Sequence, residues 1–498
     1  MPFDVFIIGG GINGCGVARD AAGRGISVCL AEKSDLGGAT SSGSSKLIHG
    51  GLRYLEYYDF SLVRKSLRER EVLWKIAPHI IYPLRFVLPH HQALRPPWFL
   101  RLGLFLYDHL GGRNLLPGTR RVNFPRDETG RPLESNYRLG FEYSDCWVDD
   151  ARLVVLNARD AADRGAKIFS HTKVINARRQ DGLWYINTLG PAGQTQCFSA
   201  RVLVNASGPW VYDTSKQLGA NTGQLQPRLI RGSHIVVPRL YDHDRCYILQ
   251  NADGRIVFVM PYEDTLTLIG TTERHHKTAL EDVCIEDDEI AYLCESVNGY
   301  FLKKINPDDV VWSYSAVRPL FDDGSTETKS VTRDYRIVTE SENNTLPVIS
   351  ILGGKITTYR TLAEEVMQEI ARFVPISKGS WTGQSPLPGG DFGCNEYDQQ
   401  VEGLHRDYPF LDRRHARRLI RLYGTRSRTI LQDAKSLADL GQRFGSDLYE
   451  AEVQYLVEDE WGTRAEDILW RRTKEGLRFS DEETSALEGY LQREAIHT

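Results

Sequence analysis

The sequence lacks several features that would place the protein in other classes. Its eight cysteines form no C-x-x-C pair and show no zinc-type spacing, so we expect reduced thiols and no metal site. No window supplies about 18 uncharged apolar residues, which excludes a transmembrane helix but not a helix lying in the membrane surface. Because Asp4 interrupts the one early apolar stretch, a signal peptide is not expected.

Charge of one sign is not in excess either. Lys and Arg number 61 and Asp and Glu number 66, so the formal net charge is −5. Without a global basic field, nucleic acid is not an expected partner. The 498 residues correspond to about three domain equivalents, and the 41% hydrophobic and 26% charged composition is typical of globular proteins. The chain has the size and composition of an enzyme.

The start of the chain fits a dinucleotide-binding βαβ unit. A buried strand, a helix of small residues and a second strand are predicted at residues 5–8, 17–22 and 26–31. The turn before the helix is G-x-G-x-x-G, formed by Gly9, Gly11 and Gly14, and Glu32 follows 18 residues later (32 minus 14). The glycines let the backbone approach a pyrophosphate, and Glu32 can accept hydrogen bonds from ribose hydroxyls. This pattern does not separate NAD from FAD.

Residues 37–55 are dense in hydroxyl groups and glycine, and they end in a histidine, an arginine and a tyrosine. Such a segment can donate many hydrogen bonds to a diphosphate and to the edge of a ring. By composition alone, a flexible Ser/Gly loop explains it as well.

The motifs along the chain resemble those of one enzyme family. T-S-S-x-S-S-K-L-I-H-G-G-L-R-Y-L-E at residues 40–56 resembles the signature of FAD-dependent glycerol-3-phosphate dehydrogenases, the respiratory, quinone-linked enzymes. Further motifs resemble that family in its own order, at residues 142–150, 205–210, 270–272, 314–320, 332–335 and 353–360. The resemblance covers nearly the whole chain. Since neither an EF-hand-type acidic loop nor a transit peptide is recognised, the chain resembles the bacterial form.

The resemblance implies an α/β fold with three parts. A Rossmann-type FAD-binding domain, similar to those of glutathione reductase and glycine oxidase, is expected to be discontinuous, at residues 1–75, 150–230 and 330–385. An antiparallel-sheet substrate-binding or cap domain is expected at residues 76–149 and 231–329, where alternating apolar stretches predict strands. After a loop cluster at residues 386–390, helical periods predict a C-terminal helical domain through residue 498.

Non-covalent FAD is the cofactor that the resemblance implies. Its expected binding residues are Gly9, Gly11, Gly14 and Glu32 of the βαβ unit, Thr40, Ser41, Ser42, Ser45 and Lys46 of the hydroxyl-rich segment, and Gly208, Trp210, Gly354 and Thr357.

Oxidising a secondary alcohol on a phosphorylated three-carbon substrate requires fixed cations for the phosphate dianion. Those expected here are Arg53, Arg318, Arg333 and Lys355, and a guanidinium can bind phosphate oxygens bidentately. Tyr54 and Thr272 can donate neutral hydrogen bonds to the same substrate. Taken singly, each arginine fits a surface ion pair, and only the matched motifs favour substrate binding.

The implied reaction is oxidation of sn-glycerol 3-phosphate to dihydroxyacetone phosphate, with hydride transfer from C2 to flavin N5. His49 is the one imidazole in the hydroxyl-rich segment, and imidazoles change charge near neutral pH, which suits a base for the hydroxyl proton. An orienting role for His49 stays open, as does a proton path through the Arg318 region. His49 and Arg318 are therefore the candidate catalytic residues.

A quinone-linked enzyme must touch a membrane. The resemblance implies ubiquinone or menaquinone as electron acceptor and a cytoplasmic protein, peripheral on the inner face of the cell membrane. Residues 95–107 combine arginines with aromatic and aliphatic side chains, which fits a membrane-surface helix and equally a buried core helix. The arginine cluster at residues 413–421 fits a solvated helix face, anionic lipid or a partner carboxylate. The oligomeric state is open, with a homodimer as one expectation.

Other functions fit part of the pattern. A glycerol-3-phosphate oxidase, which returns electrons to O₂, would keep the phosphate-binding cations, whereas a flavin amine or amino-acid oxidoreductase would need only one carboxylate-binding arginine. A flavin-bearing redox sensor would not be reduced by an alcohol phosphate at all.

Overall fold

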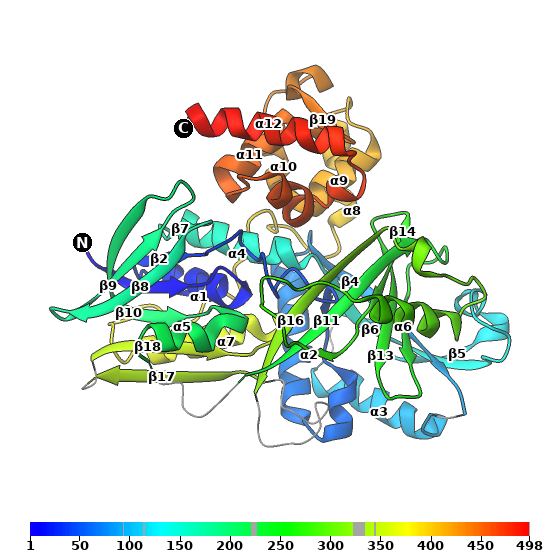
Figure 1. Cartoon of the computed structure of the whole chain (residues 1–498). Helices are drawn as coiled ribbons and strands as arrows, with labels where there is room; N and C mark the ends of the chain where they lie inside the picture. The colour runs from blue at the N-terminus through cyan, green and yellow to red at the C-terminus, as the bar shows by residue number, and fades with distance from the viewer. Residues whose placement is uncertain (93, 113–114, 221–226, 322–333, 343–344, 498) are drawn as a thin grey trace.

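Two large sheets and a C-terminal group of helices make up the molecule (Figure 1). The computed structural model describes residues 1–498 except 93, 113–114, 221–226, 322–333, 343–344 and 498. The predicted α/β class, with a second, largely antiparallel sheet and a helical C-terminal part, is confirmed.

The first sheet extends the predicted βαβ unit. β1 (Phe3–Ile8) lies between β2 (Val28–Ala31) and β10 (Thr195–Asn205), and both neighbours run parallel to it. The sheet continues through the parallel strands β7 (Lys167–Phe169) and β18 (Thr345–Leu352), the antiparallel edge strand β17 (Arg336–Glu342), and the hairpin of β8 (Lys173–Gln180) and β9 (Leu183–Leu189). β2 and the last four residues of β1 are buried, as expected where both faces of a parallel sheet are covered.

The two faces of this sheet bury alternate residues of β1. Val5 and Ile7 belong to a core shared with α1 (Ile12–Gly23), α4 (Asp150–Asp163) and α7 (Tyr359–Ile370). Phe6 and Ile8 pack on the opposite face, against residues of β9 and β10. This alternation follows from the two-residue period of a strand. The short helix α5 (Val211–Gln217) follows β10.

The second sheet is antiparallel apart from the pairing of β12 with β4. Its strands are, in spatial order, β15 (Arg274–His275), β11 (Pro227–Pro238), β14 (Leu266–Gly270), β13 (Ile256–Tyr262), β12 (Cys246–Gln250), β4 (Ile81–His90), β6 (Leu139–Val148) and β3 (Leu47–Ile48), with β16 (Trp312–Phe321) on β11 and β5 (Arg120–Asn123) on β6. The helices α2 (Phe60–Ile76), α3 (Pro97–Leu110) and α6 (Asp287–Asn298) accompany it. β3 comes from the range 1–75, and β11 starts before residue 231, so strands of this sheet cross the expected boundaries, which stay a proposal.

The C-terminal part has its own hydrophobic core, which includes Leu404, Leu419 and Leu456. Its elements are α8 (Tyr397–Asp407), α9 (Arg413–Tyr423), α10 (Ser427–Leu431), the hairpin β19 (Arg443–Gly445) and β20 (Leu448–Tyr449), α11 (Glu450–Glu460), a π-helical segment (Asp467–Arg472) and α12 (Asp481–His497). These elements lie at one end of the molecule, and α3 lies at the opposite end (Figure 1).

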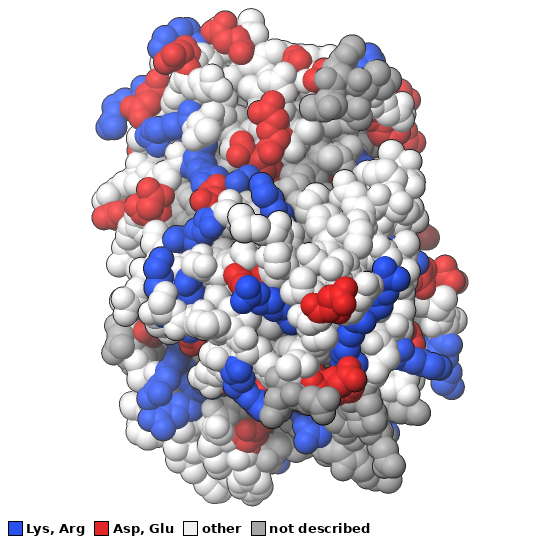
Figure 2. Space-filling model, turned by 90° about the vertical axis from the view of Figure 1, so that its left-hand side faces the viewer, with Lys and Arg blue, Asp and Glu red and all other residues white. Residues whose placement is uncertain are grey.

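Most arginines of α9 are engaged within the chain. Arg413 pairs with Glu402, Arg417 with Asp398 and the partly buried Arg418 with Glu452, while Arg421 donates to the carbonyl of His79. On the face drawn in Figure 2, basic and acidic side chains are interspersed. None of the helices in the described part of the chain has the length and hydropathy needed to cross a bilayer.

Candidate active site

The G-x-G-x-x-G turn connects β1 to α1 in a form that only glycine allows. Gly9 has φ +108°, and a Cβ on it would lie 2.5 Å from the carbonyl oxygen of Ala206. A Cβ on Gly14 would lie 2.0 Å from the carbonyl oxygen of Gly9. Glu32 accepts a 2.6 Å hydrogen bond from the N–H of Gly10, so its carboxylate lies beside the turn. The fingerprint has the geometry that brings backbone close to a pyrophosphate.

A cavity of about 980 Å³ starts at this turn and extends to α3. It is large enough for a bound cofactor and a small ligand together. The predicted residues that line it are Gly11, Thr40, Ser41, Ser45, His49, Arg53, Tyr54, Gly208, Arg318, Gly354, Lys355 and Thr357. Residues far apart in the sequence thus meet around one space.

Three further predicted cofactor residues line a neighbouring cavity of about 540 Å³, namely Ser42, Lys46 and Trp210, and Thr40 lines both cavities. Lys46 is buried, and its ammonium pairs with Asp150 at 2.8 Å. The indole N–H of Trp210 donates to Glu281 at 3.2 Å. Arg333 lies outside the described residues.

Three of the basic residues that line the large cavity are predicted phosphate ligands, namely Arg53, Arg318 and Lys355. Arg53 and Tyr54 lie on a 3₁₀ helix (Leu52–Tyr57) that follows Gly51, whose φ is +76°. The ammonium of Lys355 lies 3.7 Å from the centre of the Tyr54 ring, which orients it by a cation–π contact. Arg318, on β16, donates from Nη2 to the hydroxyl of Thr271 at 3.5 Å. The arrangement suits a doubly charged anion.

Thr272 does not line this cavity, whereas Thr271 does. The Thr272 hydroxyl is buried, donates a 2.5 Å hydrogen bond to Glu289 and accepts one of 3.0 Å from the N–H of Ser233. Its hydrogen-bonding capacity is therefore used within the protein. Two adjacent threonines follow β14, and the sequence motif does not tell which one faces inward.

The backbone of His49 is held by Thr357. Its N–H donates to the hydroxyl of Thr357 at 3.3 Å, and its ring lies edge-on to Phe258, with centroids 6.5 Å apart. The next residue, Gly50, donates from its N–H to the Tyr107 hydroxyl at 2.8 Å. No pattern in the sequence identifies Tyr107 as a partner of the His49 segment.

Asp145 binds both Tyr107 and the backbone of Gly50, next to His49. Its carboxylate accepts hydrogen bonds from Arg70 at 2.6 Å and from the Tyr107 hydroxyl at 2.8 Å. Burial raises the pKa of Asp145 above its ordinary value, although Arg70 acts in the opposite direction. Asp145 stands inside the 142–150 motif, which was the one signal that could have identified it.

A second histidine lies beside the hydroxyl-rich segment. His234 is buried on β11, its Nε2 lies 2.9 Å from the Ser45 hydroxyl, and its ring stacks on Tyr314. Burial, together with the charges of Arg318 and Lys46, lowers the pKa of His234 well below the ordinary range, so the imidazole is neutral. A histidine within the apolar stretch 234–238 was the available sequence signal.

The residues around the turn fit FAD. The glycines leave a cradle that a Cβ would fill, and the side-chain oxygen of Asn13 is a buried acceptor in the cavity wall that has no hydrogen-bond partner among the described residues. Hydroxyl groups of Thr40, Ser41 and Ser45 follow along the same wall. These groups can hold a diphosphate and a ring edge.

Comparison with known sequences decides the family. The FAD dependent oxidoreductase family matches residues 4–360, and the C-terminal domain of alpha-glycerophosphate oxidase matches residues 380–493. The chain belongs to the FAD dependent oxidoreductase family. It is an oxidoreductase with FAD as its cofactor, which confirms the resemblance stated from the motifs.

Three similar proteins show how far this FAD dependent oxidoreductase matches its relatives. It is 51% identical to D-erythritol 1-phosphate dehydrogenase of Brucella abortus (strain 2308), over 97% of this chain and 96% of the relative. It is 48% identical to aerobic glycerol-3-phosphate dehydrogenase of Escherichia coli (strain K12), over 98% and 97%. The structure of glycerol-3-phosphate dehydrogenase from Bacillus halodurans complexed with FAD shares the fold, with a TM-score of 0.77, 24% identity, and coverage of 99% of this chain and 94% of that one.

Proposed function

We propose that this oxidoreductase oxidises sn-glycerol 3-phosphate to dihydroxyacetone phosphate and passes the electrons to a quinone in the membrane. The observation that carries the proposal is the composition of the 980 Å³ cavity. The glycine turn, the cations Arg53, Arg318 and Lys355, and an apolar part beside α3 all line this one cavity. This apolar part is called the apolar arm. The motif resemblance and the 48% identity to aerobic glycerol-3-phosphate dehydrogenase support the same substrate.

We assign a role to each basic residue of the phosphate site. Arg53, Arg318 and Lys355 bind the phosphate, and the Tyr54 ring keeps the Lys355 ammonium in place. Arg333 is proposed as a fourth phosphate ligand from its motif alone. When bound, FAD accepts the two electrons and the hydrogen from C2 of the substrate at flavin N5.

His49 is proposed to accept the hydroxyl proton. It lines the cavity together with Arg53 and Arg318, and its backbone is fixed by Thr357. Fixing the base relative to the phosphate site places it against one carbon of the substrate, which supplies the orientation that proton transfer requires.

The apolar arm of the cavity supports a membrane-soluble acceptor. It is lined by Phe99, Leu100, Leu102, Leu104 and Leu106 of α3, together with Leu88, Ile248 and Phe258 from the second sheet. A ring with an isoprenoid chain matches such a lining, whereas O₂ does not require one. We therefore prefer ubiquinone or menaquinone to O₂ as the acceptor.

α3 is the segment that we propose docks on the membrane. Trp98 is 69% exposed and Phe105 is 55% exposed, while only Leu104 and Tyr107 of this helix are buried. The exposed basic residues Arg95 and Arg101 can reach lipid headgroups. α9 lies toward the opposite end of the molecule (Figure 1), so the two helices cannot meet one flat membrane together. A cytoplasmic enzyme, peripheral on the inner face of the cell membrane, and a homodimer stay proposals.

D-erythritol 1-phosphate is a second candidate substrate. The 51% identity to the Brucella abortus enzyme favours it, and that substrate carries the same phosphate and secondary alcohol on one more carbon. The cations would bind either phosphate, so the distinction lies in the space beyond the reacting carbon.

Turnover with paired substrates and acceptors tests the proposal. We expect kcat/KM for glycerol 3-phosphate to exceed that for D-erythritol 1-phosphate, and reduction of a soluble quinone analogue to exceed peroxide formation in air. A reversed substrate ratio would make the enzyme a tetritol-phosphate dehydrogenase. Stoichiometric peroxide in the presence of the quinone analogue would make it an oxidase.

A further inference from the structure

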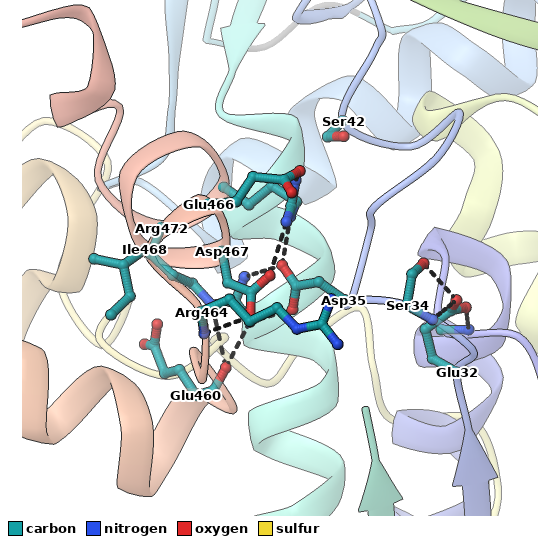
Figure 3. A network of polar contacts seen from close by, with 12 residues as sticks. Glu32, Ser34, Asp35, Ser42, Glu460, Arg464, Glu466, Asp467, Ile468 and Arg472 are labelled. Atoms are coloured by element: carbon teal, nitrogen blue, oxygen red, sulfur yellow. Dashed lines mark hydrogen bonds and ion pairs between the residues drawn. The ribbon is translucent and has the colours of Figure 1, made fainter. Parts of the chain in front are cut away.

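The C-terminal helical part reaches into the loop that carries Glu32, the acid expected to bind the FAD ribose. This loop, residues 32–38, follows β2, and the Glu32 carboxylate accepts hydrogen bonds from the N–H of Gly10 and from the N–H and hydroxyl of Ser34. Asp35, one residue further along, points to the C-terminal part and is buried there (Figure 3). The loop thus has a nucleotide side and a C-terminal side.

Two adjacent arginines hold Asp35. Arg472, itself fully buried, binds the carboxylate bidentately, with both N–O distances at 2.8 Å. Arg471 donates to the same carboxylate through Nε. Both arginines end the π-helical segment Asp467–Arg472, and Arg472 is anchored by donating 3.1 and 2.7 Å hydrogen bonds to the carbonyl of Glu460. A bidentate guanidinium fixes both the position and the plane of a carboxylate.

The C-terminal part also contacts loop 32–38 indirectly, through His171. Asp467 accepts a 3.0 Å hydrogen bond from Nε2 of His171, which lies just after β7. The backbone N–H groups of His171 and Thr172 donate to the carbonyls of Ser34 and Glu32, at 2.8 and 2.7 Å. The C-terminal part therefore reaches Glu32 both through Asp35 and through His171.

A metal ion is not the natural occupant of this cluster. Ligand atoms of Asp35, His171 and Asp467 lie within 4.8 Å of one another, as a cation site would require. However, guanidinium groups already bind both carboxylates, since Arg471 also donates to Asp467 at 2.8 Å. Two fixed positive charges at this distance would repel a metal cation.

We propose that Arg471 and Arg472 are positioning residues for the cofactor, through which the C-terminal helical domain holds loop 32–38 in the form that presents Glu32 to FAD. The Asp35 carboxylate, once buried, needs these partners, and without them the loop would have to move to bring Asp35 to water. Glu32 would move with it, because only Lys33 and Ser34 stand between Glu32 and Asp35 in the chain. The C-terminal domain thereby sets the affinity for FAD.

The coupling must act in both directions. If docking of the Asp467–Arg472 segment favours FAD binding, FAD binding favours docking of that segment by the same factor. Hydrogen exchange of the wild-type chain can detect this without any substitution. We expect FAD to slow exchange in residues 464–474. The informative residues are Asp467, Ile468, Leu469 and Arg472, because they line neither the large cavity nor the neighbouring one.

The main test is Arg472→Lys, which keeps the charge but loses the planar fork. FAD is removed, the fold of the apoprotein is checked by circular dichroism, and FAD rebinding is followed by flavin fluorescence. We expect the Kd for FAD to rise tenfold or more, while kcat at saturating FAD and KM for glycerol 3-phosphate stay within about twofold of wild type. Asp35→Asn should give the same pattern. The Kd for FAD of the double variant should not exceed that of the single variant with the higher Kd.

Glu460→Gln is the matched control. Glu460 forms a fully buried ion pair with Arg152 of α4 in the same interface, yet it does not contact loop 32–38 through its side chain. We expect Glu460→Gln to lower the unfolding temperature and to leave the Kd for FAD within twofold. Equal weakening of FAD binding by both variants would show general loosening and overturn the proposal. An unchanged Kd in folded Arg472→Lys would overturn it as well, and if that variant does not fold, unchanged exchange in residues 464–474 on adding FAD to wild type would do so.

Discussion

The Tyr107 hydroxyl on α3 donates a 2.8 Å hydrogen bond to Asp145 on β6 and accepts the N–H of Gly50, the neighbour of His49. The helix that exposes Trp98 and Phe105 is thus tied by one buried hydroxyl to the backbone of the proposed base. The Tyr107 hydroxyl therefore connects the helix proposed to meet the membrane with the segment that carries the proposed base.

Tyr107→Phe should therefore affect both stability and rate. It removes one donor from Asp145 and one acceptor from Gly50, which we expect to cost about 1–3 kcal/mol in the free energy of unfolding and to lower kcat. Tyr137→Phe is the control, because Tyr137 donates one hydrogen bond to the carbonyl of Gly299, away from the cavity. Urea unfolding and turnover of both variants give the comparison. Equal kcat values in the two variants would contradict a role for Tyr107 in placing His49.

Arg318→Lys tests the phosphate site. Lysine keeps a positive charge but cannot bind two phosphate oxygens with a planar fork, so we expect kcat/KM for glycerol 3-phosphate to fall by about tenfold or more. Arg274→Lys serves as the control, since Arg274 pairs with Asp288 at the surface. If Arg318→Lys retains the wild-type kcat/KM, the substrate phosphate binds elsewhere.

Polar substitution of α3 separates membrane docking from chemistry. The double change Trp98→Ser with Phe105→Ser removes two exposed apolar side chains that do not line the cavity. We expect binding to anionic phospholipid vesicles, measured by sedimentation, to fall by at least tenfold, with turnover of a soluble dye acceptor unchanged. A matched change on α9, Arg413→Ser with Arg417→Ser, should leave vesicle binding intact. Loss of vesicle binding only in the α9 variant would transfer docking to that helix.

Much of the fold followed from sequence, because βαβ periodicity, turn glycines and helical periods are local signals. The cations at the cavity also followed, since each stands in a motif. Three features could not follow. Arg472 and Asp35 are 437 residues apart, so no spacing reveals their pairing. The choice between Thr271 and Thr272 depends on the local backbone after β14. An apolar helix such as α3 has the same pattern whether its face meets a core or solvent.

Glu263 predicts a pH dependence of stability. Burial raises its pKa from 4.5 to about 7, although Arg478 of the C-terminal part, 3.6 Å away, acts in the opposite direction. Since the folded chain binds this proton more tightly than the unfolded chain, its contribution to stability is present below pH 4.5 and is lost as pH rises through about 7. Because the side chain is partly exposed, we expect an effect of about 1–2 kcal/mol. Glu263→Gln should gain that much over wild type between pH 5 and pH 8 in urea unfolding, and parallel curves for the two proteins would refute the assignment.

The most direct measurement is anaerobic titration of the purified, FAD-containing protein with glycerol 3-phosphate, followed by the flavin absorbance. The proposed site predicts bleaching of the yellow colour at one equivalent per flavin, recovery of the colour on adding a quinone analogue, and no bleaching by glycerol without its phosphate. A colour that persists with glycerol 3-phosphate, or that bleaches equally with glycerol, would contradict oxidation at a phosphate-binding cationic site.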